Sequence, residues 1–202
     1  MNSSELLSVV TFGYGIAATL YLVSWIFQKP FPSQLAKWAT ILTVIGNLAG
    51  FFMRWAESYD LGIGHAPLSN MYESLVFFAL TIGIIYLLIE KRYQNPMIGV
   101  FATPIAFLAM AYASMSPNIS DRIQPLVPAL KSNWLIAHVF TCFLGYAAFT
   151  IAFGVSIMYL LKKRERSDGK GLLAHLPTLN ILDELTHRMV LFGFLFLSVG
   201  II

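Results

Sequence analysis

The chain has 202 residues, of which 57% are hydrophobic and only 11% are charged, and its mean hydropathy is +0.71. A soluble domain of this length does not need so much apolar surface, so the composition predicts an all-α polytopic membrane protein. The net charge of +3 gives no reason to expect nucleic acid as a partner. The single cysteine, Cys142, excludes an internal disulfide and any CxxC redox or zinc site.

Four apolar segments in the first half of the chain predict membrane-spanning helices. They cover residues 6–27, 35–55, 72–89 and 96–114. Residues 28–33 and 56–71 are rich in proline, glycine or polar side chains, so we expect them to be connections. We expect Lys37 and Arg54 to reach the membrane interfaces by snorkelling, and Pro104 to kink the fourth helix.

The fifth segment, residues 132–161, is thirty residues long and has no formal charge, but it contains His138. An ionisable side chain inside an apolar span is a functional-site hypothesis, because its polar atoms need partners where water is scarce. Trp134 and Cys142 lie one helical turn before and after it, on the same face. A flat aromatic ring beside an imidazole suits a planar ligand, and Trp134 equally suits an interfacial belt. From the residues alone, His138 is either a buried, hydrogen-bonded structural residue or a ligand.

The last part of the chain predicts two separate elements. Leu176, Leu179, Leu182 and Leu185 have near-helical spacing beside acidic residues, which favours a short interfacial segment. A sixth span then begins at His187, with 14 apolar residues up to the last one. We therefore expect about six transmembrane helices, the last one cut short, in a single transmembrane domain over residues 1–202 that is part of a longer protein.

The basic residues predict the orientation in the membrane. With six alternating spans, one side carries Lys29, Lys37, Lys91, Arg92, Lys162, Lys163, Arg164, Arg166, Lys170 and Arg188, and the other carries only Arg54, Arg122 and Lys131. The positive-inside rule then predicts that the N-terminus, the His65 loop and His138 are extracytoplasmic. His187 would lie about 30 Å from His138, across the hydrocarbon, so these two histidines cannot ligate one haem as in a cytochrome b. Among the histidines present, His65 is the one expected to approach His138.

Three stretches carry more information than composition does. They are GHAPLSNMYESL at residues 64–75, SNWLIAHV at 132–139 followed by GYAA at 145–148, and LDELTHRMVLFGF at 182–194. Together they resemble the CcsA/ResC family of System II cytochrome c assembly proteins, in the family's order and spacing. The resemblance covers most of the chain from about residue 50 onward.

The resemblance implies a haem-handling subunit of a cytochrome c synthase in the cytoplasmic (inner) membrane. It implies haem b as cofactor, with His138 as an axial ligand of the iron at the outer face, and it makes Trp134 and His65 further candidates for haem contact. The expected partners are a CcsB/ResB-type membrane protein and an apocytochrome c with a CxxCH motif, whose thiols form thioether bonds to the haem vinyl groups. The family's WWD segment and two further histidines are not among the 202 residues, so this fragment is not expected to be active alone.

Three questions stay open at this point. His65, with Asn70, Tyr72 and Glu73, matches a family pattern that either touches haem or only orders the loop. We expect His175 to be a solvated loop residue and His187 an interfacial one. The alternative function is a transporter or permease subunit without haem ligation, although the internal repeats typical of transporters are not evident in the sequence.

Overall fold

The computed structural model describes residues 2–126, 132–164, 171–173 and 175–202. Its helices are α1 (Ser3–Phe27), α2 (Pro30–Asp60), α3 (Met71–Tyr93), the short 3₁₀ helix η1 (Pro96–Ile98), α4 (Gly99–Met115), α5 (Asn133–Arg164) and α6 (Leu179–Ile201). The described residues contain no strand, and six of their helical segments are long and apolar enough to span a membrane. The predicted fold class, an all-α multi-pass membrane protein, is therefore confirmed.

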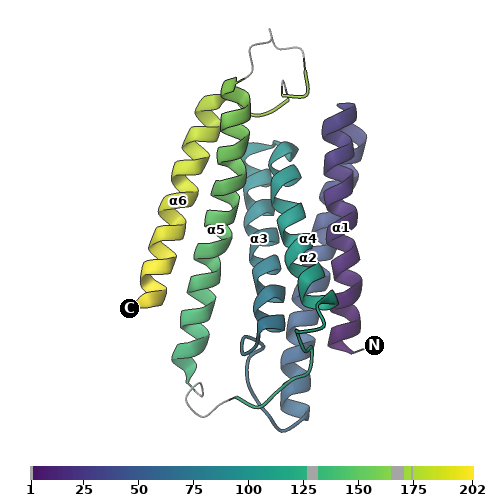
Figure 1. Cartoon of the computed structure of the whole chain (residues 1–202), viewed down its shortest axis with the longest axis vertical. Coiled ribbons are helices and arrows are strands. Elements are labelled where there is room, and N and C mark those ends of the chain that lie inside the picture. Colours follow the sequence, from purple (N-terminus) through teal and green to yellow (C-terminus); the bar gives the residue numbers. More distant parts are fainter. Residues whose placement is uncertain (1, 127–131, 165–170, 174) are drawn as a thin grey trace.

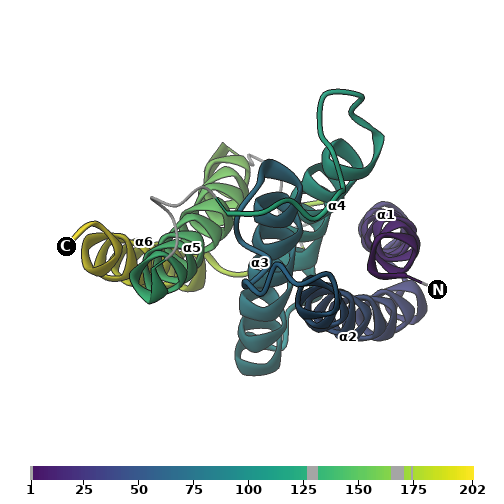
Figure 2. The same ribbon diagram turned by 90° about the horizontal axis from the view of Figure 1, so that it is seen from below.

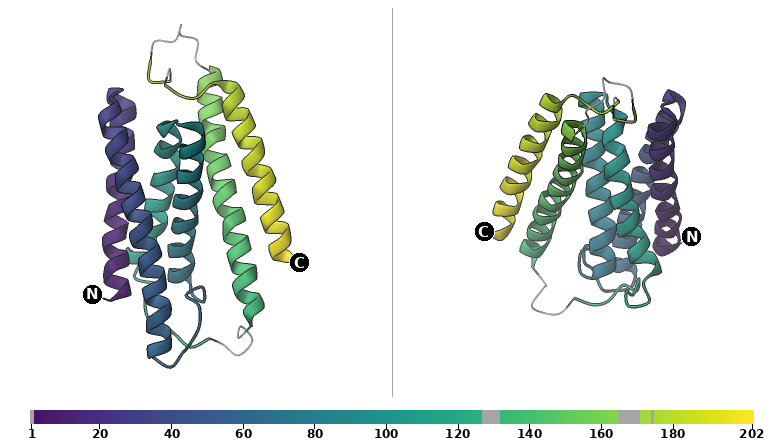
Figure 3. Two further views of the ribbon diagram at one scale, coloured as in Figure 1. Left: turned by 180° about the vertical axis from the view of Figure 1, so that it is seen from behind. Right: turned by 45° about the horizontal axis from the view of Figure 1, so that its top comes forward.

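The six long helices run alternately up and down (Figure 1). Seen along their axes, α3 and α4 lie in the middle, α1 and α2 on one side, and α5 and α6 on the other (Figure 2). Both chain termini lie toward the end that carries the α2–α3 and α4–α5 connections, which we call the terminal end (Figures 1 and 3). The opposite end carries the other three connections and most of the lysines and arginines, and we call it the basic end.

A buried polar cluster ties three helices together near the basic end. The hydroxyl groups of Tyr21 in α1 and Tyr86 in α3 donate hydrogen bonds to Glu90 Oε2, at 3.2 and 2.7 Å. Lys37 Nζ in α2 lies 3.7 Å from Glu90 Oε1 and is 39% exposed. Because a carboxylate in an apolar environment is costly without partners, these contacts explain why Glu90 is tolerated at 5% exposure.

The predicted breaks between spans were too wide. α2 begins at Pro30, where proline at the first helical position costs no hydrogen bond, so only residues 28–29 separate it from α1. It continues to Asp60, so residues 56–60, predicted to be a connection, are helical. α3 likewise continues through Glu90 to Tyr93, because partners from other helices satisfy the carboxylate of Glu90.

The prediction of a separate interfacial segment before the sixth span was wrong. Leu182 and Leu185 belong to the first two turns of α6, which is continuous from Leu179 to Ile201. Both leucines are almost completely buried, at 0% and 1% exposure, and they belong to the main hydrophobic core. The neighbouring Asp183 and Glu184 are exposed, so this amphipathic turn faces the bundle and not a membrane surface.

Candidate functional site

His138 lies in the second turn of α5 and contacts the last turn of α6. Its Nδ1 is 2.5 Å from the carbonyl oxygen of Gly200. Cys142, one turn further along α5, is buried, and its Sγ lies 3.9 Å from His138 Nε2, as the shared helix face predicted. His138 itself is exposed, so the hydrogen-bonded part of the structural interpretation holds but the buried part does not.

Glycines allow α5 and α6 to approach closely enough for this contact. A Cβ atom on Gly145 would lie 3.0 Å from the carbonyl oxygen of Gly193, and one on Gly193 would lie 3.1 Å from that of Gly145. A Cβ on Gly200 would lie 2.7 Å from Cys142 Sγ. At Gly145 and Gly193 the two helices therefore pack backbone against backbone, which is how helices associate in lipid.

The Gly200 carbonyl determines which nitrogen of the neutral His138 ring carries the proton. A carbonyl oxygen only accepts hydrogen bonds, so Nδ1 must donate, and Nε2 keeps its lone pair. Metal-binding histidines commonly have this arrangement, in which the second nitrogen donates to a backbone carbonyl that fixes the ring. His138 therefore offers one nitrogen with the chemistry of an axial haem ligand. Trp134, one turn earlier, is 62% exposed.

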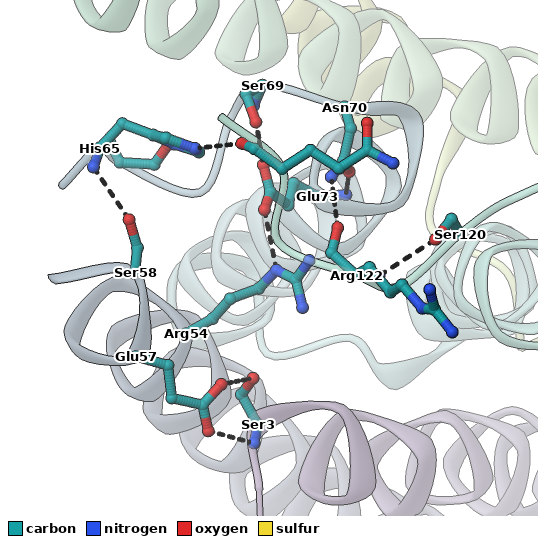
Figure 4. Close-up of polar contacts among 12 residues, drawn as sticks. Ser3, Arg54, Glu57, Ser58, His65, Ser69, Asn70, Glu73, Ser120 and Arg122 are labelled. Carbon is teal, nitrogen blue, oxygen red and sulfur yellow. Dashed lines mark hydrogen bonds and ion pairs between the residues drawn. The ribbon is translucent and has the colours of Figure 1, made fainter. Parts of the chain in front are cut away.

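His65 has a different environment, in the loop between α2 and α3. Gly62 and Gly64 have positive φ angles of 72° and 67°, which turn the chain back so that the His65 N–H donates to Ser58 Oγ at 2.9 Å (Figure 4). The ring Nδ1 lies 2.8 Å from the Ala66 carbonyl oxygen, and Nε2 lies 2.9 Å from that of Gln124. Only an imidazolium ring, with a proton on each nitrogen, donates to both oxygens. To bind iron, the His65 ring would have to give up its contact with one of these two carbonyl oxygens.

The structure does not bring His65 and His138 together. A cavity of about 390 Å³ lies beneath the His65 loop, and its lining includes His65 with Leu135 and Ile136 of α5, but not His138. His138 instead contacts α6. His65 therefore lies beside a cavity at one face of α5, whereas His138 points from another face of α5 toward α6. An adjoining apolar cavity of about 420 Å³ between α2, α3 and α5 shares Ile136 and also excludes His138.

Arg54 does not snorkel to the membrane interface as predicted. It is 2% exposed, and its Nε donates to Glu73 Oε1 at 2.9 Å (Figure 4). The guanidinium also lies 5.0 Å from the centre of the Tyr72 ring. Glu73 Oε2 accepts hydrogen bonds from the N–H and hydroxyl of Ser69, and Asn70 caps α3 through the Glu73 N–H. Residues 64–75, the first of the three family-like stretches, thus fold around an arginine that was expected at the membrane interface.

Two contacts join this loop to the segment after α4. Besides the contact of His65 with Gln124, the Asn70 side-chain amide donates to the Arg122 carbonyl oxygen at 3.5 Å. Asn70 and Glu73 are thereby engaged in holding the loop. These contacts are those expected of residues that order the loop.

The remaining histidines lie away from His138. His175 is exposed, and His187 is exposed in the third turn of α6, near the basic end. Within the described part of the chain, no three His, Cys, Asp or Glu side chains cluster in a way that could hold a metal ion. A single histidine, with a fixed tautomer, is therefore what this chain presents to a ligand at the terminal end of α5 and α6.

Comparison with known proteins identifies the family. Residues 68–202 match the family described as "Cytochrome C assembly protein". The chain is 33% identical over 194 residues to the cytochrome c biogenesis protein CcsA of Prochlorococcus marinus (strain MIT 9313), covering 81% of this chain and 59% of that protein. It is 31% identical over 238 residues to CcsA of Pyropia yezoensis, covering 96% and 73%. The chain thus spans 59% of the length of the first of these relatives. These matches show that the chain belongs to the CcsA family, and its six helices of membrane-spanning length make it a multi-pass membrane protein.

Proposed function

We propose that this chain is the haem-handling part of a cytochrome c synthase and that His138 supplies an axial ligand to haem b. The observation that carries the proposal is the hydrogen bond between His138 Nδ1 and the Gly200 carbonyl, which leaves Nε2 able to bind iron. The exposure of the His138 ring supports it as well, since a ligand arriving from outside the helix pair can reach the ring.

Each neighbouring residue has a distinct part in this site. The Gly200 carbonyl holds the proton on Nδ1 and fixes the plane of the ring. Gly145 and Gly193 keep α5 and α6 close enough for that bond. Trp134, exposed one turn from His138, provides a flat apolar surface beside the ring. Bound haem would supply the vinyl groups that react with the thiols of an apocytochrome c.

The proposed orientation places His138 on the extracytoplasmic side of the cytoplasmic membrane. It rests on the sorting of ten basic residues to one side of the six spans and three to the other. In this orientation His138 faces the compartment of a secreted apocytochrome c, which with a CcsB/ResB-type membrane protein is the proposed partner. A cysteine at Ser69 should then react with a membrane-impermeant thiol reagent in intact cells, and one at Lys163 should not. The reverse pattern would invert the orientation.

The test of the ligand role separates it from the structural role of the same ring. His138→Asn keeps an amide donor near the position of Nδ1, so the bond to Gly200 can persist, but it removes Nε2. His138→Ala removes both. In the full-length protein with its partner, we expect both variants to lose co-purifying haem and to reduce cytochrome c maturation at least tenfold, because a lost iron ligand weakens haem binding.

Two controls accompany these variants. His187→Ala changes an exposed histidine near the other end of the same helix pair, and it should leave haem content unchanged. External imidazole should partly restore haem binding to His138→Ala, since a free ring can occupy the vacated position. Normal haem content and maturation in His138→Asn would show that the ring serves only to join α5 and α6.

A further inference from the structure

A second candidate site lies at the basic end, between α3 and α6. A cavity of about 230 Å³ is open on one side there. Its apolar wall consists mainly of Leu88, Ile89, Leu185, Met189 and Phe192. In a bilayer such a groove is filled by an apolar chain, either from a lipid or from another molecule.

Two arginines from distant parts of the sequence meet at this groove. Arg92 is the penultimate residue of α3, and Arg188 lies in the third turn of α6; both line the cavity. Arg92 is exposed and forms no ion pair with any residue in the described part of the chain. Arg188 pairs with Glu184 one turn earlier on α6. Because Glu184 offsets only one of the two arginines, the groove keeps a positive charge.

A tyrosine hydroxyl adds an independent observation. Tyr93 lines the same cavity, and its hydroxyl oxygen is buried without a hydrogen-bond partner among the described residues. Buried hydroxyl groups in native structures nearly always have a partner, because an unsatisfied one costs free energy. This hydroxyl is covered by protein atoms, so it would meet a headgroup oxygen in the groove only after rotation of the Tyr93 side chain.

We propose that this groove binds one anionic phospholipid. The phosphate lies between Arg92 and Arg188, whose planar guanidinium groups suit phosphate oxygens, and the Tyr93 hydroxyl donates to a headgroup oxygen once its side chain has rotated toward the groove. An acyl chain lies along the apolar wall. Basic pockets between transmembrane helices commonly bind anionic lipid headgroups in this way. The charge of the groove favours an anionic lipid over a zwitterionic one.

Such a lipid would hold α6 in place. α6 packs mainly against α5 and has few direct contacts with the rest of the bundle. A headgroup bound by one arginine from α3 and one from α6 connects these two helices at the basic end. This role does not depend on haem binding by His138, which lies at the opposite end of the helix pair.

The first experiment removes the charge. The full-length protein, purified in mild detergent with phosphatidylglycerol and phosphatidylcholine of the same acyl chains, is examined by native mass spectrometry. We expect retained phosphatidylglycerol to fall at least tenfold in Arg92→Gln/Arg188→Gln, because two charge-assisted contacts to phosphate are lost. Lys163→Gln/Arg164→Gln removes the same charge from the same end, away from the groove, and should change little. Equal retention in the two double variants would overturn the proposal.

The second experiment fills the groove and keeps both arginines. Leu88→Trp places a bulky ring at the groove, where Leu88 is 62% exposed, and its control is Leu108→Trp on α4, where Leu108 is 63% exposed. We expect Leu88→Trp to lose bound phosphatidylglycerol and Leu108→Trp to retain it. If Leu88→Trp loses haem while phosphatidylglycerol stays bound, the groove holds haem carboxylates and the lipid proposal is wrong.

Discussion

The bundle of α1 to α4 and the pair formed by α5 and α6 are built in different ways. In the most apolar stretch of α3, 67% of the residues are buried, but in that of α6 only 17% are. α1 to α4 contact one another around the core. α6 packs mainly against α5 (Figure 2). Within this chain, α3 is therefore largely enclosed by other helices and α6 is largely exposed. His138 belongs to the pair.

The two regions also use polar groups differently. The bundle contains the buried ion pair of Arg54 and Glu73 at the terminal end and the Glu90 cluster toward the basic end. The pair is held by glycine contacts and by the bond from His138 to Gly200. Substitutions in the bundle should therefore lower stability most. Substitutions between α5 and α6 should act mainly on the ligand site.

The largest loss of stability is expected for Glu73→Ala. It leaves the Arg54 charge buried without its partner, which typically costs about 3 to 5 kcal/mol. Replacing both residues by leucine should cost much less, since no charge then remains buried. The measurement is the free energy of unfolding in SDS titrations, with exposed Asp60→Ala as the control. A smaller loss in the single variant than in the double variant would contradict the importance of this pair.

Gly145→Leu should distinguish the two regions most clearly, because it should disturb the contact between α5 and α6 and leave the bundle of α1 to α4 intact. The new side chain would meet the Gly193 backbone, so α5 and α6 must move apart at a cost of about 1 to 3 kcal/mol. We expect co-purifying haem to fall, because His138 loses its contact with Gly200, while the Glu90 cluster stays intact. Phe153→Leu, on an exposed face of α5, is the control. Unchanged haem content in Gly145→Leu would mean that close packing of the pair is not required for the site.

Tyr86→Phe should have a moderate effect, confined to the bundle. It removes a 2.7 Å hydrogen bond to the Glu90 carboxylate, and such bonds to charged groups contribute about 1.5 kcal/mol or more. Haem content should not change, and Tyr112→Phe, at an exposed position, should leave the unfolding free energy unaltered. Loss of haem at normal stability would show that the bundle and the site are not separable.

The smallest effect is expected for Asn47→Leu. The Asn47 amide donates to the Tyr14 hydroxyl at 3.2 Å and to the Val76 carbonyl oxygen at 3.4 Å, but its Oδ1 is buried without a partner in the described structure. Hydrogen bonds between transmembrane helices average about 0.6 kcal/mol each, and leucine also removes the unsatisfied oxygen, so the loss of the two bonds should cost about 1 kcal/mol or less. An unfolding free energy lowered by more than about 2 kcal/mol would show that Asn47 organises the core.

Apolar length predicted the number and order of the spans, but not where they end. Glu90 and Arg54 were taken as boundary residues because a charge normally marks an interface, whereas each of them pairs with a buried side chain on a neighbouring helix. The partner of His138 was not predictable, because Gly200 lies 62 residues away and contributes only its backbone.

The position of α5 between two polar regions has a thermodynamic consequence. One face of this helix presents His138 to α6, and another presents Leu135 and Ile136 to the cavity beneath the His65 loop. A ligand that shifts α5 from either side therefore changes the free energy of binding on the other. Linkage is reciprocal, so the factor by which an occupant of the His65 cavity alters affinity at His138 equals the factor by which a ligand at His138 alters affinity in that cavity.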